Sequence, residues 1–164
     1  MRALLMARGM DTFGWGCAWR SLCWSRLKDA DKAYQLYLNV LRPSVGNSNG
    51  TSANWFDMYS QGSYTIFQID ANLGGAAAAL EMLLYSRPGV IELLPALPDA
   101  WAGKGSVTGL GARGGFVVDL SWRKGKVTST TIRSVGGTTT ELRAGAHSER
   151  IDISPGTSVT ITLP

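Results

Sequence analysis

The residues with the clearest chemical potential lie in one short stretch, Phe67 to Gly75, which reads FQIDANLGG. Its carboxylate, Asp70, stands between the amides of Gln68 and Asn72, and apolar residues alternate with all three. A carboxylate held among apolar neighbours must be paired, hydrogen-bonded or shifted in pKa. Such groups are over-represented in active sites, so Asp70 is predicted to lie away from ordinary solvated surface as a candidate catalytic residue.

A structural role for Asp70 is also open at this point. Gly74 and Gly75 precede an alanine-rich segment, and a carboxylate just before a helix often caps it. Gln68 and Asn72 could brace the same loop instead of contacting a ligand. Spacing alone therefore leaves both catalysis and helix capping open for Asp70.

Helices are expected on both sides of this stretch. Apolar residues at i, i+3 and i+4 spacing predict a helix over 15–27, whose large side chains cover an arc wide enough for burial on more than one side. A second helix is expected over 32–42, with Asp29 or Asp31 as its cap. A third is expected over 75–86.

The remaining segments divide into one long loop and a β-rich half. Residues 44–65 are rich in Ser, Asn and Gly and are expected to lack regular structure, as functional loops often do. Alternating apolar and polar residues predict strands, joined by glycine turns, over 116–122, 127–134, 151–153 and 159–163. Short strands at this spacing indicate an antiparallel sheet or a small sandwich.

These patterns predict an α+β protein in two parts, helices in residues 1–87 and an antiparallel β domain in residues 88–164. Three helices do not close a helical domain. The chain also opens within a helical pattern at Leu4, Leu5 and Met6. We therefore expect the helical part to be the end of a larger helical array.

Composition excludes several classes of partner. The net charge is +4, and each part carries eight basic and six acidic residues. A nucleic-acid-binding protein concentrates its basic residues on one stripe, so no nucleic-acid partner is expected. No stretch reaches the roughly 18 apolar residues of a membrane span, so no membrane partner is expected.

No metal site and no cofactor are predicted. The chain has one histidine, His147, and two cysteines, Cys17 and Cys23, whose spacing matches no zinc motif. Six residues apart on a helix, the two cysteines point about 120° apart and cannot form a disulfide. Both are expected to be buried free thiols.

Several ordered motifs resemble glycoside hydrolase family 95, the α-L-fucosidases and their relatives. The stretch from Phe67 to Gly75 is similar to the family's F-Q-I-D-G-N-F-G-G signature, and residues 54–57 resemble its N-L-F-D segment. Further matches in register are Gly14-Trp15, Ala18-Trp19-Arg20, Glu81 to Leu84, Leu93 to Pro98, Gly109-Leu110 and Ala112 to Phe116. The resemblance runs from about residue 8 to about residue 143.

The resemblance implies a fold and a mechanism. Family members have an N-terminal β region, an (α/α)6 catalytic barrel and a C-terminal β domain, so this chain would be the end of the barrel plus that β domain. Inverting hydrolysis needs a general acid and a base that activates water. Asp70 would be the base, whereas the acidic Glu and the Asn residues that assist the base would lie in a missing upstream barrel segment. The isolated chain is therefore expected to have little or no activity.

The same resemblance implies a fucosylated oligosaccharide or a related glycoside as substrate, and secreted or periplasmic full-length relatives. Aromatic faces suit the apolar faces of sugar rings. Trp15, beside a glycine, and Trp55, in the predicted loop, are the better stacking candidates, whereas Trp19 and Trp24 are expected in the core. Gln68 and Asn72 are further candidates for substrate binding.

Three departures from the family pattern keep the exact sugar open. Tyr64 stands where the family often has His, Ala71 replaces Gly and Leu73 replaces Phe. The missing His could remove a sugar contact, so activity on a related sugar such as L-galactose stays open. The competing interpretation is a non-catalytic carbohydrate-binding or structural β module.

Overall fold

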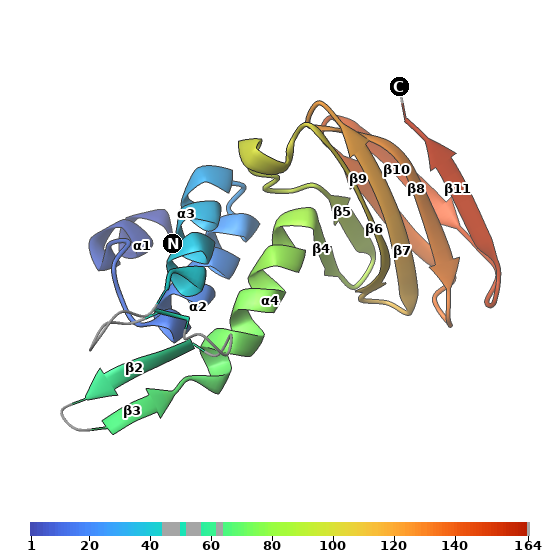
Figure 1. Ribbon diagram of the computed structural model, residues 1–164. Helices are drawn as coiled ribbons and strands as arrows, with labels where there is room; N and C mark the ends of the chain where they lie inside the picture. The colour runs from blue at the N-terminus through green and yellow to red at the C-terminus, as the bar shows by residue number, and fades with distance from the viewer. Residues whose placement is uncertain (44–49, 52–56, 62–63, 164) are drawn as a thin grey trace. The chain divides into compact units, whose positions relative to one another are not determined.

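The computed structural model describes residues 1–43, 50–51, 57–61 and 64–163 (Figure 1). It comprises two compact units, Met1–Glu81 and Met82–Pro164. The first unit is mainly helical and the second is built of strands, as expected for an α+β chain. The division lies slightly before the expected boundary at residues 87/88.

Four helices begin in the described part of the first unit, and they are α1 (Arg2–Arg8), α2 (Gly14–Arg26), α3 (Ala30–Leu41) and α4 (Ile69–Leu83). The helices α2 and α3 match the first two expected helices within a few residues. Asp29 is the cap of α3, since its carboxylate accepts a hydrogen bond from the Lys32 amide at 3.3 Å. The other candidate cap, Asp31, lies in the first turn of that helix.

The start of α4 corrects the expected helix over 75–86, because the helix begins at Ile69 and ends at Leu83. Gly74 and Gly75 lie inside it, where they permit close packing. A Cβ at Gly74 would lie 3.0 Å from the Cβ of Ala18 in α2, and one at Gly75 would lie 3.2 Å from Val40 Cγ1 in α3. The two glycines therefore serve helix contact and do not start the helix.

The expectation of a loop without regular structure over 44–65 is also wrong. This region contains β1 (Gly50–Thr51) and β2 (Asp57–Gln61), and β3 (Tyr64–Phe67) begins within it. The order β1-β2-β3 is antiparallel throughout, with Met58 opposite Phe67 and Gln61 opposite Tyr64. The β3 strand leads directly toward α4 (Figure 1).

The second unit contains two four-stranded sheets in its described residues, with orders β10-β9-β5-β4 and β11-β8-β7-β6. The strands are β4 (Leu84–Arg87), β5 (Val90–Leu93), β6 (Lys104–Ala112), β7 (Phe116–Arg123), β8 (Lys126–Ser134), β9 (Thr139–Ala144), β10 (His147–Asp152) and β11 (Ser158–Thr162). Neighbouring strands are antiparallel except β5 and β9, which run parallel. A 3₁₀ turn, Asp99–Trp101, precedes β6.

The strands expected over 116–122, 127–134 and 159–163 correspond to β7, β8 and β11. The one expected over 151–153 is the end of β10, which begins at His147. The sequence patterns missed β4, β5, β6 and β9. The expected helix over 75–86 includes residues 84–86 of β4, because the apolar run of α4 continues into this strand without a turn residue.

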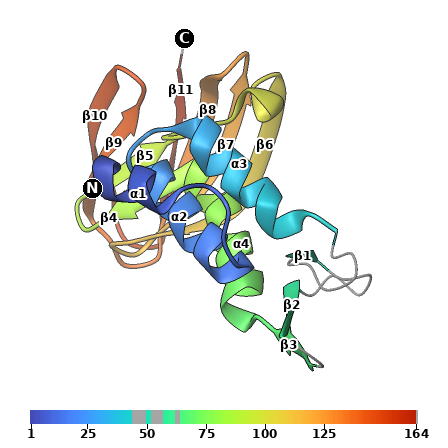
Figure 2. The ribbon, with the colours of Figure 1, turned by 90° about the vertical axis from the view of Figure 1, so that its left-hand side faces the viewer.

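One hydrophobic core lies between the two sheets and makes the second unit a sandwich. Its most buried members come from both sheets, namely Ile91, Leu93, Leu142, Val118, Leu120 and Ile132. Figure 2 shows the β4-β5-β9-β10 and β6-β7-β8 strands as separate groups. The small β-sandwich expected from the sequence is thus present, with one parallel strand pair in it.

Among the described residues, none of the helices has the length and hydropathy needed to cross a membrane. Within the same residues, no three His, Cys, Asp or Glu side chains gather closely enough to hold a metal ion. Both cysteines are free thiols. Cys17 is buried as expected, whereas Cys23 is half-buried, so its expected burial is wrong. Burial raises the pKa of both, so neither is a ready nucleophile.

Candidate functional site

Asp70 lies in the first turn of α4, and its side chain is exposed. Its Oδ1 accepts a hydrogen bond from the Ala71 amide at 3.2 Å, and it forms no ion pair with any described residue. The flanking Ile69 and Leu73 are 61% and 68% exposed. Residues 69, 70 and 73 share one face of α4. All three are exposed, so the apolar neighbours do not shield the carboxylate from solvent. The expectation that they keep Asp70 from solvent is therefore wrong for this chain.

Gln68 and Asn72 connect the start of α4 to the start of α2. Gln68 is buried, and its Oε1 accepts a hydrogen bond from the Trp15 backbone amide at 3.2 Å. The Asn72 side chain donates to the Gln68 carbonyl oxygen at 2.7 Å. These contacts are those of bracing residues. The predicted binding of substrate by Gln68 and Asn72 stays a prediction.

A hollow of about 520 Å³ lies beside Asp70 in the helical unit. Its described lining residues come from the end of α1, one face of α2 and the first turns of α4, namely Arg8, Trp15, Ala18, Trp19, Leu22, Asp70 and Gly74. Trp15 is 47% exposed, so the indole that was predicted to stack on a sugar is accessible. The other predicted stacking residue, Trp55, lies outside the described residues.

The two remaining tryptophans of the helical pattern behave differently. Trp24 is buried, as predicted. Trp19 is 44% exposed and lines the hollow, so its assignment to the core was wrong. Trp15 and Trp19 are four residues apart and therefore lie on the same face of α2. This spacing could have predicted that both indoles line the same hollow.

Arg8 also lines the hollow, although no sequence motif pointed to it. Its guanidinium carbon lies 5.8 Å from the centre of the Trp19 ring, within the range of a cation–π contact. Arg20 donates hydrogen bonds from Nη1 to the carbonyl oxygens of Arg8 and Gly9, at 2.8 and 2.9 Å. The end of α1 is thus fixed on α2 beside the hollow.

Both parts of the chain match models of one enzyme family. The glycosyl hydrolase family 95 catalytic domain matches residues 1–83, and the glycoside hydrolase family 95 C-terminal domain matches residues 85–162. The chain belongs to glycoside hydrolase family 95. The resemblance of the sequence motifs to this family is therefore confirmed.

Three curated relatives are similar to most of this chain. Alpha-L-fucosidase 2 of Arabidopsis thaliana is 33% identical over 95% of this chain and 18% of its own length. The probable alpha-fucosidase A of Aspergillus oryzae is 40% identical over 72% of this chain and 17% of its own length. The probable alpha-fucosidase A of Aspergillus niger is 41% identical over 66% of this chain and 14% of its own length. The chain thus spans less than a fifth of the length of these curated relatives.

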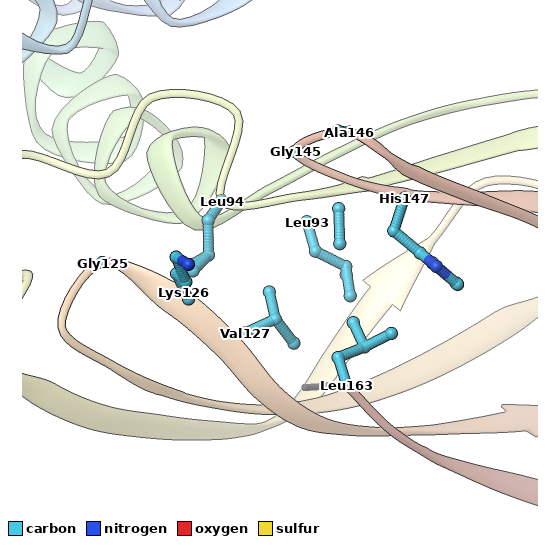
Figure 3. Close-up of a pocket in the computed structure, with 10 residues that line it drawn as sticks. Leu93, Leu94, Gly125, Lys126, Val127, Gly145, Ala146, His147 and Leu163 are labelled. Carbon is cyan, nitrogen blue, oxygen red and sulfur yellow. The ribbon is translucent and has the colours of Figure 1, made fainter.

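The family-95 C-terminal region has a cavity of its own, of about 390 Å³ (Figure 3). Leu93, Val127 and Leu163 point into it, and the turns at Gly125 and Gly145 border it. Its described lining is aliphatic or small apart from Lys126 and His147, and it includes no tryptophan, tyrosine or phenylalanine ring on which a sugar could stack. The hollow in the catalytic-domain region is therefore the better candidate site.

Proposed function

We propose that this chain supplies one half of the active site of an inverting α-L-fucosidase-type glycoside hydrolase. In this proposal Asp70 is the base that activates water, and residues outside the chain supply the general acid and the rest of the barrel. The observation that carries it is the position of Asp70. An exposed carboxylate at a helix start borders a hollow with two accessible indoles, in the region that matches the family-95 catalytic domain.

The surroundings of Asp70 suit a base. Its carboxylate is accessible, forms no ion pair with any described residue and can accept a proton from water. Trp15 and Trp19 offer flat apolar surfaces for a sugar ring, and we assign the ring a position against them.

The apolar surface around Asp70 supports the second part of the proposal. The exposed face of α4 carries Ile69, Leu73 and Leu80, which are 61%, 68% and 48% exposed. A helix that is apolar on all sides is normally buried on all sides. We propose that further barrel helices cover this face in the complete enzyme and bring the general acid opposite Asp70. The substrate would then be a fucosylated oligosaccharide or a related glycoside.

A hybrid enzyme tests the proposal. This chain replaces the matching segment of the Arabidopsis relative, and hydrolysis of a 2′-fucosylated oligosaccharide is measured. The hybrid should be active and should release the sugar with inverted configuration, which NMR detects before mutarotation. Asp70→Asn should lower kcat at least about a thousandfold, because the neutral amide cannot accept the proton.

Two controls make the result decisive. Asp31→Asn removes an equivalent carboxylate from the first turn of α3 and should leave kcat unchanged. The isolated chain should show no turnover. Hybrid activity that survives Asp70→Asn would refute the role of Asp70 as base, and turnover by the isolated chain that Asp70→Asn abolishes would refute the half-site proposal.

A further inference from the structure

We propose that Arg8 is a substrate-binding residue, the hydrogen-bond donor that complements Asp70 across the hollow. This inference rests on the proposed function and names a second residue of the same site. Its ligand is the sugar itself, whose hydroxyl oxygens would accept hydrogen bonds from the guanidinium.

The composition of the hollow calls for a donor. Among its described lining residues, Arg8 and Asp70 carry the charged side chains, and the others are apolar except for the indole N–H groups. A carboxylate accepts hydrogen bonds, whereas a guanidinium donates them through a rigid fork of N–H groups. Sugar hydroxyls both donate and accept. Arg8 and Asp70 together can therefore satisfy a sugar that rests on the apolar wall.

Two contacts position Arg8, one through its side chain and one through its backbone. Its guanidinium lies over the Trp19 ring, 5.8 Å from the ring centre. Its backbone carbonyl accepts a hydrogen bond from Arg20, which is only 8% exposed and whose Nε has no partner among the described residues. Burying a charged guanidinium costs free energy. The hydrogen bonds that Arg20 donates to the end of α1 offset part of that cost. A guanidinium that already rests on an indole and extends from a fixed backbone loses less conformational freedom on binding a ligand than an arginine without such contacts.

A second arginine on the same helix provides a contrast. Arg2 also lies over an indole, 5.6 Å from the ring centre of Trp24, but that ring is buried. Its guanidinium is already engaged by the Asp29 carboxylate at 3.2 Å and the Leu27 carbonyl oxygen at 2.6 Å. No described residue accepts a hydrogen bond from the Arg8 guanidinium. Its donors remain available beside the exposed indole.

The hybrid enzyme gives the kinetic test. Arg8→Ala should raise KM at least tenfold and change kcat less than threefold, the signature of lost substrate binding. Arg8→Lys, which keeps the charge but loses the fork, should raise KM by a smaller factor. Arg2→Ala is the matched control, and it should leave KM unchanged. A KM unaffected by Arg8→Ala, or raised equally by Arg2→Ala, contradicts a binding role for Arg8.

A binding measurement on the 164-residue chain separates this inference from the proposed function. L-fucose is titrated while the indole N–H resonance of Trp19 is followed by NMR. The resonance should shift in the wild type and in Arg2→Ala, and the shift should be absent in Arg8→Ala. An inactive hybrid counts against the proposed function, and the titration then decides on Arg8 alone. An unshifted wild-type resonance overturns the role of Arg8.

Discussion

The two units of this chain differ in how completely they bury their own apolar residues. In the described residues, twelve of the thirteen exposed large hydrophobic side chains belong to residues 1–81, and the remaining one is Val135. The β unit encloses a core that both of its sheets share. The helical unit packs α4 closely on α2 and α3 but leaves Trp15, Ile69 and Leu73 accessible.

This difference separates a unit that encloses its own core from a unit that leaves apolar surface beside its candidate site. The β unit encloses a core of its own, and the walls of its cavity are mostly aliphatic. The helical unit leaves apolar side chains exposed beside its candidate base and two indoles. Large exposed apolar surfaces in soluble proteins mark sites of interaction. The predictions that follow would break or sharpen the contrast between the two units.

Separating the units should produce the largest effect. A fragment of residues 82–164 should unfold cooperatively in urea, because its core lies within it. A fragment of residues 1–81 should associate or bind the dye ANS in the absence of urea, because many of its large apolar side chains are exposed. Circular dichroism and light scattering measure both. A monodisperse 1–81 fragment with a cooperative transition would contradict the contrast.

A matched pair of leucine substitutions should show the same difference within the intact chain. Leu142, which is fully buried in the β unit, should lose about 3 kcal/mol of unfolding free energy on change to alanine. Leu73→Ala should change that free energy by less than about 0.5 kcal/mol, because the side chain is 68% exposed. Urea denaturation measures both. Equal losses would mean that Leu73 is covered in solution.

A glycine in α4 tests whether the helical unit gains stability from close helix contact. Gly74→Ala should lower the unfolding free energy by about 1 kcal/mol, because overpacking against Ala18 outweighs the better helix propensity of alanine. Gly75→Ala would place its Cβ 3.2 Å from Val40 Cγ1, slightly farther than the 3.0 Å at Gly74, and should have a smaller effect. Thermal unfolding of both variants provides the comparison, and a stabilised Gly74→Ala would argue against close packing.

The smallest effect concerns a surface carboxylate of the β unit. Hydrogen bonds from Arg143 and Ser148 lower the pKa of Glu141 to about 2 from an ordinary 4.5. The depressed pKa stabilises the folded chain above pH 4.5, and this contribution is lost as the pH falls from 4.5 to 2. Glu141→Gln should therefore reduce the drop in melting temperature between pH 6 and pH 3. Arg143→Ala should act in the same direction, and a drop unchanged in both variants would exclude this contribution.

Sequence patterns predicted α2, α3, β7, β8 and β11 because local periodicity determines them. They placed the start of α4 at Gly75, since glycine ordinarily interrupts helices. Here Gly74 and Gly75 lie in the helix interior because neighbouring helices approach closely, which is a tertiary effect that periodicity does not contain.

The candidate site was predicted in part. The family motif pointed to Asp70, and the glycine before Trp15 pointed to that indole. Solvent exposure of Asp70 could not be predicted, because it depends on which face of α4 packs on α2 and α3. Arg8 could not be predicted either, because its proximity to Trp19 depends on how α1 folds back along α2.

The parallel pair of β5 and β9 has a consequence for how the sandwich assembles. Ile91 lies opposite Leu142, so forming this pair closes a loop of about fifty residues. The β6-β7-β8 meander needs only short turns. Local contacts form faster than distant ones, so the meander should be in place when β9 joins β5. We therefore expect the pairing of β5 with β9, which closes the longest loop among the strand pairs described in this unit, to limit its folding rate.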